Sequence, residues 1–131
     1  MVLIHFPIAL FIAGVAIDFW GQWTRKPALA VVAYTNLLLA AVMTVPVVVT
    51  GLLAWRWALE GQRLKGILLM HLVFGCVSSL LIWMVWLSPL RSQREQRALP
   101  GYRLPIEAVA VLAVAFTGHL GGFLSGVNVA Q

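Results

Sequence analysis

Four long apolar runs, separated by short polar or charged breaks, dominate the chain. The runs cover about residues 3–23, 29–55, 66–88 and 104–127, and each supplies the roughly 20 residues that a membrane-spanning helix needs. The breaks contain charged residues together with proline and glycine, which end helices. The pattern therefore predicts an all-α fold: an antiparallel bundle of four transmembrane helices in a single domain that covers residues 1–131.

Composition supports a polytopic membrane protein over a soluble helical domain. The chain has 131 residues, of which 62% are hydrophobic and 10% are charged, and this is too apolar for a soluble domain of this size. No basic segment precedes the first run and no small-residue cleavage site follows it, so we expect that run to remain as a span. The single cysteine, Cys76, excludes an internal disulfide and the two-cysteine attachment of a c-type haem.

Basic residues are distributed unevenly among the three predicted loops. The first and third loops contain Arg25, Lys26, Arg91, Arg94, Arg97 and Arg103, and the second contains Arg56, Arg63 and Lys65. The positive-inside rule then predicts a multi-pass protein of the bacterial inner membrane, with the first and third loops in the cytoplasm and both termini in the periplasm. The net charge of +5 fits this topology and contact with anionic lipid, and we expect no nucleic-acid partner.

Three histidines provide the candidate chemistry. At about 1.5 Å per helical residue, His5, His71 and His119 lie roughly 27, 24 and 22 Å from the cytoplasmic ends of their helices. They are therefore expected in one layer of the outer leaflet. Ionisable side chains in an apolar span are costly in lipid, so such residues usually face the protein interior or a ligand.

A bis-histidine b-type haem (heme b) fits this layer. The iron needs two imidazoles from opposite sides, and diagonal helices of an up-and-down bundle are spaced more suitably than adjacent ones. This selects His5 and His71 as axial ligands, with His119 at the ring edge or on a propionate. Small residues leave room for the ring, and arginines beside the layer suit the propionates. The further candidate cofactor-binding residues are Gly75, Gly122 and Arg56.

Other interpretations of the same residues remain open. The simplest alternative requires no cofactor. In it, His5 lies at the membrane interface, and His71 and His119 form hydrogen bonds to neighbouring helices. A three-histidine copper or zinc site and a chlorophyll bound by one histidine are further alternatives. Asp18 and Glu107 are interpreted as interfacial anchors that pair with Arg25 and Arg103. No catalytic triad, phosphate loop or carboxylate pair is recognisable, so catalysis by this chain alone is not expected.

The histidines occur in motifs that resemble a known family. His5-Phe6-Pro7-Ile8-Ala9-Leu10 begins the first run, and Gly118-His119-Leu120-Gly121-Gly122 lies in the last. Over its whole length the chain is similar to a family of small bacterial four-helix membrane proteins of unknown function. The resemblance implies association with c-type cytochromes or other redox modules. Two positions depart from the family pattern: Ala54 stands where an acid is common, and residues 123–129 lack a further histidine.

These observations lead to two alternative functions. The first is an electron-transfer subunit that holds one b-type haem near the outer face, within a larger membrane redox complex, with a periplasmic c-type cytochrome as a possible partner. The second is a cofactor-free accessory or scaffold subunit of a respiratory or photosynthetic complex. In the second case the row of glycines at 118, 122 and 126 would provide a docking face for another helix.

Overall fold

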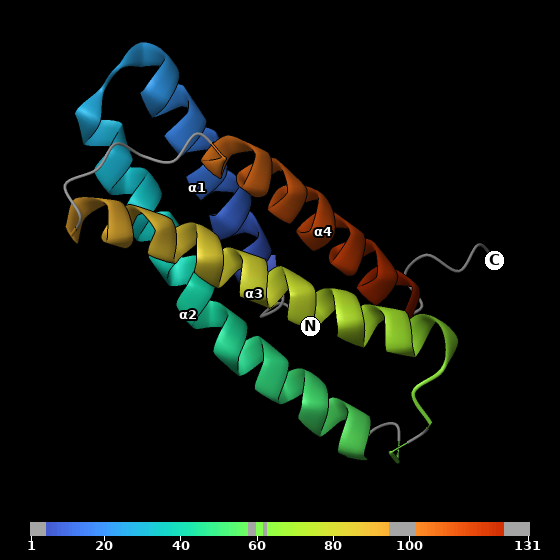
Figure 1. Cartoon of the computed structure of the whole chain (residues 1–131). Helices are drawn as coiled ribbons and strands as arrows, with labels where there is room; N and C mark the ends of the chain where they lie inside the picture. Colours follow the sequence, from blue (N-terminus) through green and yellow to red (C-terminus); the bar gives the residue numbers. More distant parts are fainter. Residues whose placement is uncertain (1–4, 58–59, 62, 95–101, 125–131) are drawn as a thin grey trace.

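The computed structural model of the chain describes residues 5–57, 60–61, 63–94 and 102–124. In these residues the backbone forms four helices, which are α1 (His5–Thr24), α2 (Pro27–Trp57), α3 (Gly66–Arg94) and α4 (Arg103–Leu124). Each contains a segment long and apolar enough to cross a membrane, and in α3 this segment is Gly66–Ser88. The all-α bundle of four membrane helices expected from the sequence is therefore confirmed (Figure 1).

The third helix is longer than its apolar run predicts. The run ends at residue 88, whereas α3 continues through Pro89 to Arg94. A proline inside a helix removes one hydrogen bond without always ending the helix. Arginine and glutamine, which follow here, are good helix formers. Arg91 and Arg94 therefore belong to α3 and not to the following loop, which corrects the boundary expected from the sequence.

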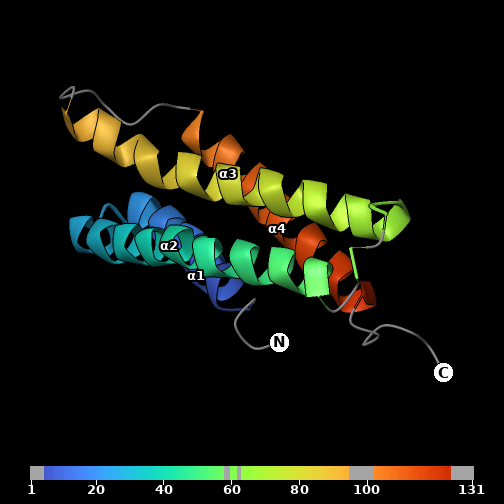
Figure 2. The ribbon, with the colours of Figure 1, turned by 90° about the horizontal axis from the view of Figure 1, so that it is seen from below.

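The helices associate as two pairs that are neighbours along the chain. Most tertiary contacts join α1 to α2 and α3 to α4, while α2 with α3 and α1 with α4 contact each other less. Figure 2 shows α1 and α2 on one side of the bundle and α3 on the other. The diagonal pairs are α1 with α3 and α2 with α4, as expected for an up-and-down bundle.

Small residues bring the helices of the first pair close together. A side chain added at Gly14 of α1 would place its Cβ 3.0 Å from Leu37 Cδ2 of α2, and Gly21 is equally close to Leu29 Cβ. Ala33, Ala40 and Ala41 of α2 are fully buried in the same region. Close backbone approach through small residues is the usual way in which membrane helices gain packing contacts without a hydrophobic driving force.

The two ends of the bundle differ in their polar residues. We call the end where α1 and α3 begin the histidine end, because His5, His71 and His119 all lie toward it. The opposite end, where α2 and α4 begin, is called the arginine end and contains Arg25 and Arg103. Large apolar side chains are exposed on all four helices between these ends, as a lipid-facing surface requires.

Candidate functional site

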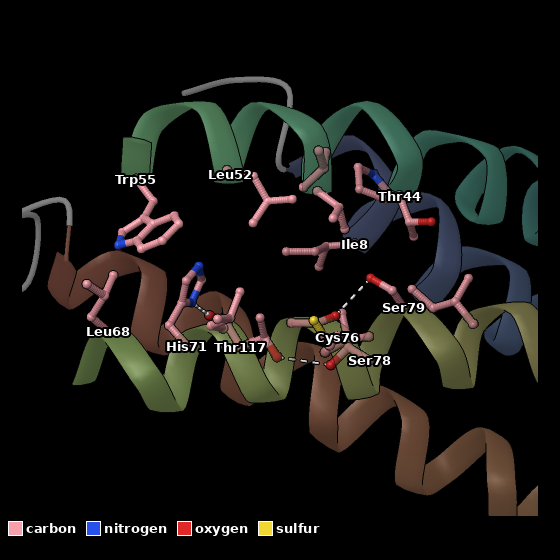
Figure 3. Close-up of a pocket in the computed structure, with 18 of the residues that line it drawn as sticks. Ile8, Thr44, Leu52, Trp55, Leu68, His71, Cys76, Ser78, Ser79 and Thr117 are labelled. Carbon is pink, nitrogen blue, oxygen red and sulfur yellow. Dashed lines mark hydrogen bonds between the residues drawn. The ribbon is translucent and has the colours of Figure 1, made fainter. Parts of the chain in front are cut away.

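A cavity of about 220 Å³ lies among the four helices toward the histidine end (Figure 3). Its wall is largely apolar, and α2 and α3 contribute most of it. Six of the apolar lining residues are Ile8, Val48, Leu52, Leu68, Leu72 and Val114. The cavity is located where the two helix pairs meet, so the sparse packing of α2 against α3 accounts for the space.

His71 is the histidine that lines this cavity. Its partly buried ring lies with Nδ1 3.2 Å from the backbone carbonyl oxygen of Thr117 on α4. A carbonyl oxygen only accepts, so Nδ1 carries the proton in this bond, and the neutral ring then has its free lone pair on Nε2. Figure 3 shows the second ring nitrogen turned away from α4, toward Trp55 of α2. His71 therefore presents a basic nitrogen to the space between the helix pairs.

Gly121 allows the His71 ring to lie against α4. A Cβ at position 121 would be 3.2 Å from His71 Cε1, closer than an ordinary van der Waals contact. One turn along α4, Gly118 lies next to Ile8 of α1, whose Cδ1 would be at an ordinary van der Waals distance of 3.5 Å from an added Cβ. Gly118, expected on a face for an external partner, is therefore in contact with a helix of the chain itself.

The hydroxyl groups around the cavity are engaged within the protein. Ser78 Oγ and Thr117 Oγ1 are 2.9 Å apart, and the Thr117 hydroxyl also donates to the carbonyl of Ala113 at 2.8 Å. The Ser79 hydroxyl donates to the carbonyl of Gly75, and Trp83 Nε1 donates to Thr44 Oγ1. The Ser78–Thr117 and Trp83–Thr44 bonds join different helices, and the other two lie within a helix. All four hydroxyls are bonded inside the bundle, so His71 is the residue best placed to bind a ligand.

The other two candidate histidines do not line the cavity. His5 is exposed at the start of α1. His119 is exposed on α4, where its ring meets Phe123 edge to face with the centroids 4.8 Å apart. Within the described ranges, no group of three or more His, Cys, Asp or Glu side chains is arranged to hold a metal ion. The structure thus places all three histidines at one end and only His71 on the cavity wall.

The remaining candidate residues are divided between the cavity and its surroundings. Gly75 lines the cavity, and a Cβ at this position would lie 3.9 Å from Thr117 Cγ2 of α4. Gly122 is partly buried on α4 and does not line the cavity. Arg56 is exposed at the last turn of α2, at the histidine end, together with the exposed Arg63. Gly126 of the glycine row lies outside the described residues.

A second polar site occurs at the arginine end. Arg103, the first residue of α4, pairs with Asp18 of α1 at 3.0 Å and with Glu107 one turn along α4 at 2.7 Å. The expected pairing of Glu107 with Arg103 is confirmed, whereas Asp18 pairs with Arg103 in place of the expected Arg25. Both acids are buried in the bundle, which corrects the expectation of exposed interfacial anchors. The sequence does contain a signal for this arrangement, because Gly14, Asp18 and Gly21 share one face of α1, and that face packs against neighbouring helices.

Replacing Gly121 by alanine tests the close approach to His71. Overpacking in a filled interior costs about 1–3 kcal/mol, and the added methyl group would have to displace a ring that is also bonded to Thr117. Gly51→Ala is the matched control, because nothing lies within 4 Å of a Cβ there. Alanine in place of glycine stabilises a helix by roughly 0.5–1 kcal/mol. We expect Gly121→Ala to unfold more easily in detergent than Gly51→Ala, and equal stability would contradict the packing described.

Comparison with protein families matches residues 1–129 to a family described as "Predicted membrane protein (DUF2231)". The match includes every residue that the structure describes, and it confirms the resemblance to a family of membrane proteins of unknown function. Neither the comparison with curated proteins nor the comparison with solved structures finds a match.

Proposed function

Because the chain belongs to this family of predicted membrane proteins, we propose that it is a membrane subunit that binds one b-type haem through His71 and carries electrons within a larger redox complex. The observation that carries the proposal is the orientation of His71. Its Nδ1 bonds a backbone carbonyl of α4, and its other ring nitrogen faces an apolar cavity. Histidines that bind metals commonly donate their second N–H to a carbonyl or carboxylate, which fixes the ring and makes the ligating nitrogen more basic.

The surroundings of His71 suit a haem in composition. A haem site in a helix bundle needs an apolar slot and an imidazole, and a bound haem supplies one-electron transfer. Gly75 and Gly51 line the cavity without side chains, and the nearby hydroxyls are bonded elsewhere, so the wall can face an apolar macrocycle. Arg56 and Arg63 lie at the same end and are suited to the propionates.

The size of the cavity restricts how a haem would fit. A volume of about 220 Å³ is below the roughly 300–1,000 Å³ typical of ligand sites, so the ring requires α2 and α3 to move apart. This interface is packed more sparsely than the one within either helix pair, and Gly51, Leu52 and Cys76 of the cavity wall are exposed there. One edge of the macrocycle would then face lipid or a partner subunit.

His5 is our candidate for the second residue that would hold the haem iron. It precedes Ile8 by three residues, so the two share a face of α1, and Ile8 lines the cavity. His5 lies on the helix diagonal to α3, one turn nearer the end of the bundle than Ile8. His119 is proposed as a residue beside the ring edge, with Gly122 on the same helix.

The proposal is tested by the reduced-minus-oxidised absorption spectrum of the protein purified from membranes that also express its neighbouring redox proteins. We expect the bands of a b-type haem in close to one-to-one stoichiometry with the chain. Stoichiometric zinc or copper in place of haem would favour a metal site. A chain that is free of haem and metal, and that co-purifies with other membrane subunits, would support the cofactor-free scaffold function instead.

We also propose that both termini face the periplasm and that the α3–α4 connection faces the cytoplasm, because the basic residues are concentrated at the arginine end. In a Cys76→Ser background, Gln96→Cys places a thiol in that connection, and Glu60→Cys places one between α2 and α3. A membrane-impermeant maleimide added to intact cells should label Glu60→Cys and spare Gln96→Cys. Labelling of the Gln96 position alone would reverse the topology.

A further inference from the structure

Three charged side chains form a buried cluster at the arginine end, far along the bundle from His71. Asp18, Arg103 and Glu107, which we call the carboxylate cluster, have exposed fractions of 5%, 7% and 1%. Arg103 Nη2 is 3.0 Å from Asp18 Oδ1, and Arg103 Nε is 2.7 Å from Glu107 Oε1. The cluster joins α1 to α4, whose mutual packing is otherwise sparse.

The hydrogen bonds are divided unequally between the two carboxyl groups. Asp18 accepts from Arg103 at Oδ1 and from the Gln22 amide at Oδ2, so both of its oxygens are satisfied. Glu107 accepts from Arg103 at Oε1, while its Oε2 is buried without a hydrogen-bond partner among the described residues. An ionised oxygen that is buried and unpaired is strongly unfavourable in an apolar bundle.

The charges of the cluster do not balance if both acids are ionised. Two carboxylates face one guanidinium, which leaves one negative charge in a buried site between membrane helices. The Arg103 guanidinium already carries its full positive charge and cannot take up another proton. A further positive charge must therefore come from outside the three side chains. A proton on Glu107 Oε2 supplies that charge and removes the unpaired anionic oxygen.

No other described group of the packed helices supplies the missing charge. On α2, the titratable residue in this half is Tyr34, whose ring packs against Trp86 of α3. On α3, the described side chains in this half up to Ser88 include no charged residue, and Trp86 has an indole N–H that is also buried without a partner among the described residues. Arg25 and Lys26 are exposed in the turn between α1 and α2.

We propose that the carboxylate cluster is a proton-binding site, with Glu107 as the residue that carries the proton and Asp18 as the ionised partner of Arg103. The proton exchanges with the aqueous phase at the arginine end. The distance to that end is short, because Glu107 lies four residues after the start of α4, or roughly 6 Å along the helix. Its partner Asp18 lies six residues before the end of α1 and is bonded by Gln22, which is exposed. This site is independent of a haem at the other end of the bundle.

Infrared spectroscopy of the protein in lipid at neutral pH tests this proposal. The chain contains only four acidic side chains, so a protonated carboxyl band is readily assigned by substitution. We expect a carboxylic acid C=O band that shifts in D₂O, that is lost in Glu107→Gln and that persists in the control Glu60→Gln, whose carboxyl group is exposed. Absence of the band from the wild-type protein, or its persistence in Glu107→Gln, would overturn the proposal.

Asp18→Asn provides a second variant that does not depend on the folding of Glu107→Gln. With one carboxylate removed, the remaining Glu107 carboxylate balances Arg103, so we expect the band to disappear although Glu107 is still present. If the band persists in Asp18→Asn, Glu107 is protonated even when Arg103 has no second carboxylate to balance. That result would overturn the proposal.

Discussion

We expect His71→Ala to abolish haem retention, because it removes the imidazole that faces the cavity while leaving the apolar wall in place. The variant keeps a helix-favouring residue at position 71 and loses one hydrogen bond to the Thr117 carbonyl, so the fold should survive at a cost of about 0.5–1.5 kcal/mol. The measurement is the ratio of haem to protein after purification, with circular dichroism to confirm that helix content is unchanged.

His119→Ala is the comparison variant for that experiment, because His119 is proposed to contact only the edge of the ring. His119 is at the same end of the bundle but is exposed and outside the cavity wall, so its loss should leave most of the haem bound. His71→Gly with added imidazole should recover haem binding if the lost group acts as a ligand rather than as a packing residue. Loss of haem in His119→Ala with retention in His71→Ala would contradict the assignment.

His5→Ala separates one axial ligand from two. If His5 is the second ligand, its removal should leave a weakly held, high-spin haem on His71. If the spectrum and the amount of bound haem are unchanged, His5 would not be one of the residues that hold the haem, although it is exposed at the same end of the bundle. Neither result tests His71, whose role is tested by the haem content of His71→Ala.

The fold is well predicted by the sequence because membrane spans have a simple physical requirement. An apolar segment of sufficient length must satisfy its backbone internally, so four such segments imply four helices. The same reasoning misplaced the end of α3, since hydropathy marks where a helix leaves the membrane and not where its hydrogen bonding stops. Arg91 and Arg94 remain helical for that reason, although the apolar run ends before them.

The candidate site was predicted only in part. His71 was selected from its depth and its small neighbours, and the structure places it on the cavity wall. Its two contacts on α4 could not be predicted, because a backbone carbonyl such as that of Thr117 has no signature in a sequence, and Gly121 is not in the helical row of Gly118 and Gly122. Depth along an axis can be calculated from residue numbers, whereas the direction of a side chain depends on how neighbouring helices are rotated.

Asp18 and Glu107 illustrate the same limit at the arginine end. Their depth near the helix ends suggested contact with water, yet both face the interior of the bundle. The four-residue spacing of Arg103 and Glu107 predicts a pair on one helix face, but only the packing of α1 on α4 brings Asp18 to the same guanidinium. The spacing along the sequence therefore does not predict that Arg103 pairs with two carboxyl groups at once.

Arg103→Met should therefore produce the largest loss of stability among substitutions of basic residues on the described helices. Removing one partner from a buried ion pair typically costs about 3–5 kcal/mol, because the remaining charge stays buried without compensation, and here two carboxyl groups lose their shared cation. Unfolding in detergent micelles measures the effect. Arg63→Met, at an exposed position, is the control and should change stability by no more than about 0.5 kcal/mol.

The triple variant Arg103→Met, Asp18→Asn, Glu107→Gln shows whether the loss is electrostatic. The triple variant leaves no uncompensated charge in the bundle, and its Asn and Gln side chains keep the shapes of the two carboxyl groups. It should therefore recover most of the stability that Arg103→Met loses through the unpaired charges. If the triple variant is as unstable as the single one, the aliphatic part of Arg103 contributes through packing, and its two ion pairs contribute little. If Arg103→Met is as stable as Arg63→Met, the cluster does not join α1 to α4 in the folded protein.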